Sequence, residues 1–244
     1  MLAFRAVSFG YSRRRGPVLA DFSYRFPSGR TVLLGPNGAG KSTLMALAVG
    51  WRTPQAGTIG WGRAEGSIGR RDQAMIGFVP QDIRPMSGLT VADQVAYAGW
   101  LKGMRLRDAR ARCGEVLDVV GLADERQVSA RALSGGQLRR LGLAMALVHS
   151  PSVMVLDEPT AGLDPSQRAN FRALMSEVFV EANMIVSTHQ VDDIEAMYTH
   201  VVVLVAGRVA WSGSPPEFLR LGADGPHQAE SAFQTVMRES GYES

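Results

Sequence analysis

Cysteine is almost missing from this sequence, and long apolar runs are missing altogether. Cys113 is the one cysteine among 244 residues, which excludes an intrachain disulfide and a cysteine-based metal cage. The longest apolar runs, such as 201–206, have the length of a strand, whereas a membrane-spanning helix needs about 20 apolar residues. The first residues lack a basic segment followed by an apolar run and a cleavage site, so we expect no signal peptide. We therefore expect a protein of the cytoplasm that reaches a membrane only through a partner.

Lysine is scarce as well, and the charge is close to balanced. Lys41 and Lys102 are the two lysines among 26 basic residues, so arginine is the default base of this chain. A lysine that persists in such a composition points to chemistry that requires a compact ammonium group. The net charge of +3 is too small an excess to argue for nucleic acid as a partner. We expect no nucleic-acid binding.

Two strand patterns occur along the chain. Apolar runs without alternation are typical of strands buried in a parallel sheet, because both faces of such a sheet are covered. Five runs of this kind lie at 31–34, 75–80, 153–156, 184–187 and 201–206. Alternating stretches at 4–9 and 22–26 are typical of an antiparallel edge. The pattern predicts an α/β fold with a mainly parallel sheet flanked by helices.

Helical periodicity replaces the strand pattern in the middle of the chain. It covers three segments, 91–100, 106–120 and 137–149. We predict a single domain over 1–244, in which an inserted helical subdomain at about 85–149 interrupts an α/β core. That core would comprise about 1–84 and 150–218. The short C-terminal tail, 219–244, would carry one helix at 229–240.

Residues 35–42 read GPNGAGKS, a G-x-x-x-x-G-K-S motif between a predicted strand and a helical run at 43–50. Its glycines let the backbone curl so that successive N–H groups point at phosphate oxygens. Lys41 would reach the β- and γ-phosphates, and the Ser42 hydroxyl would bind Mg²⁺. A chance glycine turn is the alternative, and such a string arises by chance in roughly one chain in a hundred. The flanking strand and helix favour the phosphate loop.

Two acids end the buried run 153–156. Ligands of parallel sheets bind beyond the carboxyl ends of the strands, so Asp157 and Glu158 are expected to face the same crevice as the phosphate loop. Taken alone, the pair is more simply a solvated strand end. Beside a phosphate loop, Asp157 is expected to hold Mg²⁺ and Glu158 to polarise the water that attacks the γ-phosphorus.

Gln81 and His189 follow two other predicted strands. A lone glutamine or histidine is more often structural than functional. Both residues, however, fall at strand carboxyl ends of the same predicted sheet. Gln81 would ligate Mg²⁺ or the attacking water, and His189 would donate a hydrogen bond to the γ-phosphate.

Residues 133–137 read LSGGQ and open the predicted helix 137–149. Ser134 is a good N-cap, but two adjacent glycines, Gly135 and Gly136, weaken a helix by up to about 1 kcal/mol each. A second anion site explains them better than a capped turn does. One chain has a single lysine-bearing loop, so we expect two copies arranged head to tail about a two-fold axis. Each LSGGQ would then close on the ATP of the other copy.

The segments GPNGAGKST, VPQ, LSGGQ, VLDEPTAGLD and STH together resemble the nucleotide-binding subunits of ATP-binding cassette (ABC) transporters in order and spacing, from about Val7 to Phe218. The resemblance implies a P-loop NTPase core and the site roles that follow. Tyr11 would stack on adenine, and Gln81 would link the site to a permease. The loop 161–164, with Asp164, would cross the dimer interface. The implied phosphate cradle is Gly35, Pro36, Asn37, Gly38, Ala39, Gly40, Lys41, Ser42 and Thr43, and the implied trans segment includes Ser134, Gly135, Gly136 and Gln137.

The stretch LTVADQVAYAGWLKGM resembles, more narrowly, stand-alone ATPases of ABC-2-type exporters. This implies an ATP hydrolase on the inner face of the cell membrane that powers a separate permease through ATP-driven dimer closure. The apolar face of Val91, Val95, Ala98 and Leu101 would dock a permease helix, with packing inside the helical subdomain as the alternative. An ABC ATPase that assembles a soluble complex, such as iron–sulfur cluster machinery, is the rival reading. The segment 60–71 departs from the polar hairpin usual in the family, which leaves the strands in that segment open.

Overall fold

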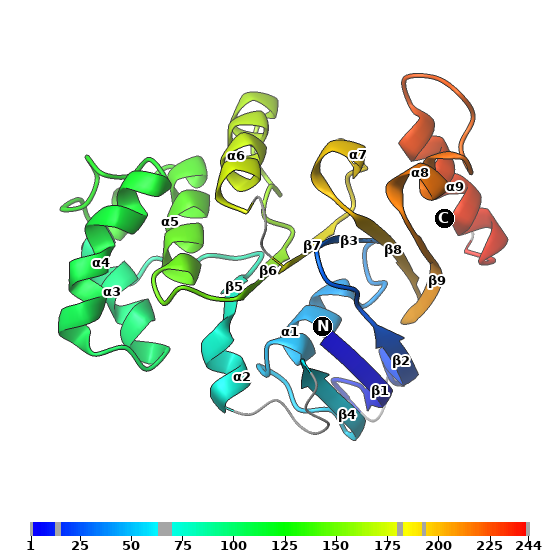
Figure 1. The fold of residues 1–244 in the computed structure, drawn as a ribbon, viewed down its shortest axis with the longest axis horizontal. Helices are drawn as coiled ribbons and strands as arrows, with labels where there is room; N and C mark the ends of the chain where they lie inside the picture. The colour runs from blue at the N-terminus through cyan, green and yellow to red at the C-terminus, as the bar shows by residue number, and fades with distance from the viewer. Residues whose placement is uncertain (1, 13–15, 63–69, 180–182, 192–193, 243–244) are drawn as a thin grey trace. The chain divides into compact units, whose positions relative to one another are not determined.

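The structure is a computed structural model, and it describes residues 2–12, 16–62, 70–179, 183–191 and 194–242 (Figure 1). The chain forms two compact units, which we describe separately. The first unit combines Met1–Gly69 with Asn183–Ser244, and the second is Arg70–Ala182. Among the described residues, no helix is long and apolar enough to cross a membrane.

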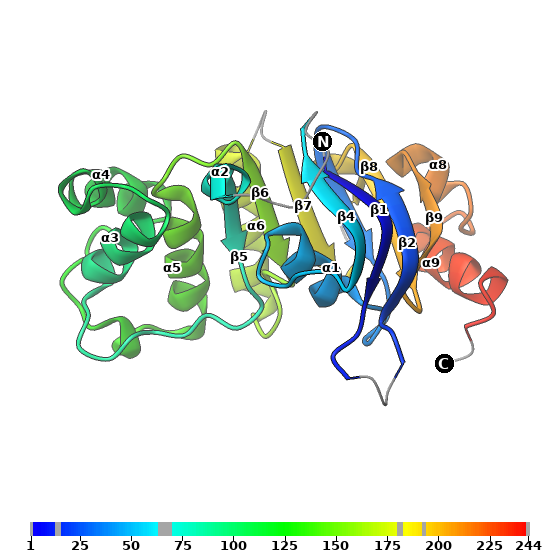
Figure 2. The same ribbon diagram turned by 90° about the horizontal axis from the view of Figure 1, so that it is seen from below.

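The first unit contains two groups of paired strands (Figure 2). Its described elements are β1 (Leu2–Phe9), β2 (Leu19–Arg25), β3 (Arg30–Leu34), α1 (Lys41–Ala48), β4 (Ala56–Trp61), β7 (Asn183–Thr188), α7 (Ile194–Met197), β8 (His200–Val205), β9 (Arg208–Gly213), α8 (Pro215–Leu219) and α9 (Gln228–Glu239). In one group β1 pairs antiparallel with both β2 and β4. In the other β3 is parallel to β7 and to β8, and β9 runs antiparallel along β8. The parallel core strands and the antiparallel edge predicted from the sequence are both confirmed.

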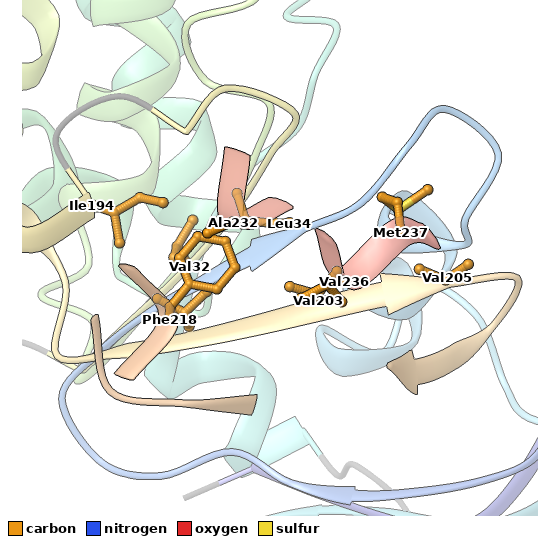
Figure 3. Close-up of a cluster of buried hydrophobic side chains, with 10 residues drawn as sticks. Val32, Leu34, Ile194, Val203, Val205, Phe218, Ala232, Val236 and Met237 are labelled. Atoms are coloured by element: carbon orange, nitrogen blue, oxygen red, sulfur yellow. The ribbon is translucent and has the colours of Figure 1, made fainter. Parts of the chain in front are cut away.

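The C-terminal helices of the first unit complete a buried core. Val32 of β3 and Val203 of β8 contribute to a cluster with Phe218 of α8 and Val236 of α9 (Figure 3). All four are buried, and fully burying an aliphatic or phenyl side chain stabilises a fold by about 1.5–3 kcal/mol. The predicted tail helix at 229–240 is therefore present as α9, but it is part of the core rather than a polar appendage.

The second unit places helices around two parallel strands. Its described elements are α2 (Arg70–Met75), β5 (Ile76–Val79), α3 (Val91–Leu101), α4 (Leu106–Val119), the 3₁₀ turn η1 (Ala130–Ala132), α5 (Gly135–Leu147), β6 (Val153–Asp157) and α6 (Pro165–Val178). β5 and β6 pair in parallel, with Val79 opposite Leu156. Three helices, α3, α4 and α5, follow β5 and precede β6, as the sequence pattern predicts. Thr90 caps α3 by accepting a hydrogen bond from the Asp93 N–H at 3.1 Å.

The strand predicted at 75–80 begins one residue later than expected, at the junction of α2 and β5. That strand was expected to begin at Met75, whereas Met75 ends α2 and β5 begins at Ile76. Lys102 closes this helix end, because its Nζ donates to the carbonyls of Gln73 and Ile76 at 2.8 Å each. A carbonyl in the last turn of α2 and the first carbonyl of β5 thus both accept from the compact ammonium that the lysine-poor composition singles out. Of the atypical segment 60–71, residues 63–69 lie outside the described part of the chain.

Candidate nucleotide site

The phosphate loop joins β3 to α1, and its glycines serve different needs. Gly38 and Gly40 have φ of 82° and 102°, in the left-handed region that favours glycine. At Gly35 a Cβ would collide with the carbonyl oxygen of Leu204. At Gly38 a Cβ would meet nothing within 4 Å, so the space over this residue is open to a ligand. The loop therefore has the curled backbone and the open cradle that a phosphate needs.

Lys41 is the first residue of α1 and lies buried beneath the loop. Its Nζ donates to the carbonyls of Gly35 at 2.7 Å and Pro36 at 3.2 Å. The side chain thus crosses the loop and fixes its opening residues. The next residue, Ser42, is exposed and offers a hydroxyl oxygen at the N-terminal end of the helix.

Tyr11 and His189 lie near this loop within the first unit. The Tyr11 hydroxyl is 3.2 Å from Oγ1 of Thr43, in the first turn of α1. His189 follows the end of β7, and in the parallel pairing of β3 with β7 Leu34 is opposite Thr188. The phosphate loop and His189 therefore leave the sheet at the same edge, one residue after paired positions. The sequence predicted this shared edge from the strand patterns.

The second unit gathers the predicted carboxylates and Gln81 at one strand edge. Because Val79 pairs with Leu156 in parallel, Gln81 and Glu158 each come two residues after a paired position. Asp157 and Glu158 are buried, whereas Gln81 is exposed. Glu158 has a φ of 47°, a left-handed conformation that costs a non-glycine residue about 1–3 kcal/mol. Such strain at a buried acid is typical of a functional position.

The LSGGQ segment begins α5 as a complete capping box. The Ser134 hydroxyl accepts from the Gln137 N–H at 3.3 Å, and Oε1 of Gln137 accepts from the Ser134 N–H at 3.0 Å. A Cβ at Gly135 would meet nothing within 4 Å, and its φ is ordinary. Neither packing nor dihedral angle requires glycine at 135. Its missing side chain leaves open space at the start of α5.

The loop 161–164 lies beside this helix start. Asp164 caps α6 by accepting from the Gln167 N–H at 2.8 Å. The side chain of that same Gln167 is 3.3 Å from where a Cβ would stand at Gly136. The two predicted interface segments are therefore neighbours within the second unit.

Arg139 is a candidate positioning residue that the sequence reasoning missed. Its guanidinium donates to the Gln81 carbonyl through Nη1, and to the Ala161 carbonyl at 2.9 Å through Nη2. Burial lowers the pKa of Arg139, and the charge of the nearby Asp82 opposes part of this shift. The first turns of α5 are thereby tied to both loops. The sequence does not mark Arg139 as special, because arginine is the common basic residue of this chain.

The predicted docking face of α3 is largely internal. Val91 and Val95 are both 0% exposed, so they belong to the core of the second unit and the packing alternative holds for them. Ala98 is half-buried, while Leu101 is 62% exposed. Trp100 is 52% exposed and stacks on Tyr97, with ring centroids 5.7 Å apart. The exposed apolar surface lies at the C-terminal end of the helix.

Comparisons with known proteins agree with this arrangement. The ABC transporter family model matches residues 19–161. YxlF of Bacillus subtilis (strain 168), an uncharacterized ABC transporter ATP-binding protein, is 37% identical over 187 residues, which are 76% of this chain and 61% of that protein. The Fe(3+) ions import ATP-binding protein FbpC of Yersinia pestis bv. Antiqua (strain Antiqua) is 37% identical over 209 residues, 82% of this chain and 58% of that protein. The chain thus spans about three fifths of the length of these curated relatives.

A solved structure extends the likeness to the whole fold. A bacterial Atm1-family ABC exporter with ATP bound is similar with a TM-score of 0.77 and 27% identity, over 100% of this chain and 42% of that one. The α/β fold with a P-loop is therefore that of the ABC ATPase cassettes. Because the family model matches more than half of the 244 residues, this chain belongs to the ABC transporter family, as an ATP-binding member.

Proposed function

We propose that this chain binds and hydrolyses ATP and thereby powers a separate membrane permease. The observation that carries the proposal is the phosphate loop, curled by Gly38 and Gly40 and fixed from below by Lys41. The solved Atm1-family exporter, at 27% identity, holds ATP. We infer the catalytic roles from the other motifs of the family pattern, VPQ, LSGGQ, VLDEPTAGLD and STH.

The residues of the loop fit a nucleotide. The open cradle over Gly38 would receive phosphate oxygens, and the buried Lys41 ammonium would neutralise part of their charge. Tyr11, already tied to Thr43, would stack on adenine. Oxygen donors suit Mg²⁺, and in this proposal the Ser42 hydroxyl, the Gln81 amide and the Asp157 carboxylate would supply them. Mg²⁺ would neutralise charge on the phosphates.

Glu158 would act as the general base. Its carboxylate would accept a proton from the water that attacks the γ-phosphorus, and His189 would donate a hydrogen bond to the γ-phosphate. The strained backbone at Glu158 supports this role, because strain is retained where a side chain must point in one direction. Gln81 would hold the water or the metal ion.

Hydrolysis would require two copies of the chain, or this chain paired with a related ATPase. Gly135 is open and unconstrained, as a residue that approaches a neighbour's phosphates should be. We propose a head-to-tail dimer in which Ser134, Gly135, Gly136 and Gln137 of each copy close on the ATP of the other. Asp164 would lie at the interface, since its loop adjoins Gly136 through Gln167.

The permease would hold the chain at the inner face of the cell membrane. Within the proposal, Trp100 and Leu101 contact that permease, since they are exposed apolar residues whereas Val91 and Val95 are core. We favour export because LTVADQVAYAGWLKGM resembles the ABC-2-type ATPases; FbpC, in contrast, is named for import. Transport into or out of vesicles that contain the co-purified permease decides the direction. Co-purification of a soluble complex instead would favour the assembly ATPase.

Replacing Glu158 with glutamine tests the hydrolytic proposal. We expect Glu158→Gln to bind ATP normally and to hydrolyse it about 10²–10⁴-fold more slowly, because the amide cannot accept the proton. The variant should accumulate as a dimer when ATP is added, as seen by analytical ultracentrifugation. Glu177→Gln, on α6, is the matched control and should leave turnover unchanged. Near-normal turnover in Glu158→Gln would remove this residue from the role of base.

A further inference from the structure

Tyr11 occupies an exposed position just after β1. Its side chain is 61% exposed, although stacking on a base requires a defined ring orientation. Immobilising a free side chain on binding costs about 0.5–1.5 kcal/mol, so a ring ordered in advance binds its partner more tightly. The contacts around Tyr11 show what orders it.

Gln55 fixes the backbone next to the ring. Gln55 immediately precedes β4, and its N–H donates to the Ser8 carbonyl at 2.9 Å, next to the Ser8–Ala56 pair of β1 and β4. Its side-chain amide then continues the pairing. The Gly10 N–H donates to Oε1 at 3.1 Å, and Nε2 donates to the Gly10 carbonyl at 3.1 Å. The amide thus replaces a peptide group and extends the ladder beyond Phe9, where β1 ends.

Arg52 fixes the ring itself. Its guanidinium carbon lies over the Tyr11 ring, 5.6 Å from the centroid, within the range of a cation–π interaction. Phe9 adds an edge-to-face contact, with centroids 5.2 Å apart and the planes at 85°. The Arg52 N–H donates to the Ala46 carbonyl at 3.1 Å, so the backbone of Arg52 is anchored to α1.

Residues at both ends of α1 have a proposed part in binding ATP. The N-terminal end of α1 carries Lys41 and the phosphate loop, and the segment that leaves its C-terminal end carries Arg52 and Gln55. We infer that Arg52 and Gln55 are positioning residues that hold Tyr11 as a preformed platform for the adenine of ATP. The inference rests on the proposed function, because it assumes that Tyr11 receives the base.

The alternative is that Gln55 and Arg52 only stabilise the loop. In that case their loss would weaken the binding of every ligand of the first unit equally, or would weaken the binding of none. An adenine platform acts on the base alone. A ligand with phosphates and no base therefore separates the two explanations, and inorganic tripolyphosphate is such a ligand.

The test measures binding of ATP and of inorganic tripolyphosphate, each with Mg²⁺, to the full chain by calorimetry. We expect Arg52→Ala and Gln55→Ala each to weaken ATP binding about 3- to 10-fold, on the scale of one exposed cation–π contact or one pair of hydrogen bonds. Tripolyphosphate affinity should be unchanged. In turnover, KM for ATP should rise while kcat stays constant, because the base contacts are equal in ground and transition states.

Conservative variants keep the test decisive if an alanine variant folds poorly. Arg52→Lys keeps a cation over the ring and should restore most of the ATP affinity. Gln55→Glu keeps the acceptor for the Gly10 N–H and loses the donor to the Gly10 carbonyl, so its affinity should lie between wild type and Gln55→Ala. Equal losses for ATP and tripolyphosphate would overturn the inference, as would unchanged ATP binding in both alanine variants.

Tyr11→Ala distinguishes the two levels of the proposal. If Tyr11→Ala leaves ATP affinity intact, the adenine role itself is wrong. If Tyr11→Ala weakens ATP binding while Arg52→Ala and Gln55→Ala do not, the platform exists and only the positioning role of the two residues is wrong.

Discussion

Glycine is present at three key positions for three different physical reasons. Gly35 leaves room for the carbonyl of Leu204, and Gly38 adopts a φ of 82° that other residues avoid. Gly135 meets neither condition, since it has an ordinary helical backbone and open space around it. A glycine that the fold does not need weakens a helix by up to about 1 kcal/mol. The proposed contact with the nucleotide of a second copy supplies a reason for glycine at this position.

Changing Gly135 to aspartate should separate folding from hydrolysis. An acid in the first turn of α5 is favourable with respect to the helix dipole, and its side chain has space, so the free energy of unfolding should be unchanged or slightly higher. Hydrolysis should fall at least 100-fold, because the carboxylate would repel the phosphates of the partner's ATP. Urea unfolding and steady-state phosphate release measure the two effects. Retained turnover would remove Gly135 from the site, and Gly135→Ala serves as the uncharged control.

Arg139 should matter for turnover rather than for ATP binding. Its guanidinium ties the carbonyls of Gln81 and Ala161 to α5, so Arg139→Ala should loosen both loops. We expect kcat to fall about 10-fold or more with little change in ATP affinity, as for an interaction that orients catalytic groups. Arg112→Ala removes a comparable bond, to Ser150, and should leave kcat unaltered. A drop in ATP affinity without a drop in kcat would contradict the assigned role.

Local spacing explains which site residues the sequence revealed. The phosphate loop, the acids 157–158 and the LSGGQ segment each consist of residues that are adjacent in sequence. In the structure they lie where the sequence predicts them, between a strand and a helix, at the end of a strand and at the start of a helix. Arg139 and Gln55 act through carbonyls that lie 58 and 45 residues away in sequence. No periodicity or motif encodes such pairings, so they become visible only in the folded chain.

At the scale of elements, the junction of α2 and β5 is held by two residues that follow other helices, Lys102 after α3 and His149 after α5. Lys102 and His149 both approach the Ile76 carbonyl, and Nε2 of His149 lies 3.2 Å from it. A carbonyl accepts, so Nε2 carries the proton of a neutral ring. Burial first, and then the Lys102 charge, lower the pKa of His149 to about 4.

This histidine should make stability depend on pH. In the folded chain its pKa is about 4, below the ordinary value of 6.5, so the folded state favours the neutral ring. The contribution is present above the unfolded pKa and is lost as pH falls from about 6.5 to 4. Compared with His149→Gln, the wild type should lose on the order of 1 kcal/mol more unfolding free energy between pH 7 and 4.5, after allowing for solvent screening. Parallel urea curves at both pH values provide the measurement; equal losses would contradict it.

Element positions were predicted closely, and element roles less so. The helix predicted at 91–100 is α3, Val91–Leu101, because Thr90 supplies a standard cap and Gly103 follows. The role of its apolar face could not be predicted, because helical periodicity marks a buried stripe without saying what buries it. Val91 and Val95 face the unit's own core, while Trp100 and Leu101 remain exposed.

At the scale of the whole molecule, the proposed catalytic groups divide between the two units. The first unit carries Lys41 and His189, and the second carries Glu158 and Gly135. The proposal adds a second copy of the chain, since Gly135 would serve the nucleotide bound by the other copy. Complementation between two defective variants tests this division of labour directly.

The decisive measurement is the ATPase activity of a mixture of Lys41→Ala and Gly135→Asp chains. Each variant alone should be inactive, because every site would have either a defective phosphate loop or a defective LSGGQ segment. If the segment acts in trans, each mixed dimer contains one site with both parts intact, and activity should rise to about a quarter of the wild-type level at a 1:1 ratio. If mixtures at every ratio stay as inactive as the separate variants, each chain uses its own LSGGQ segment and the account is wrong.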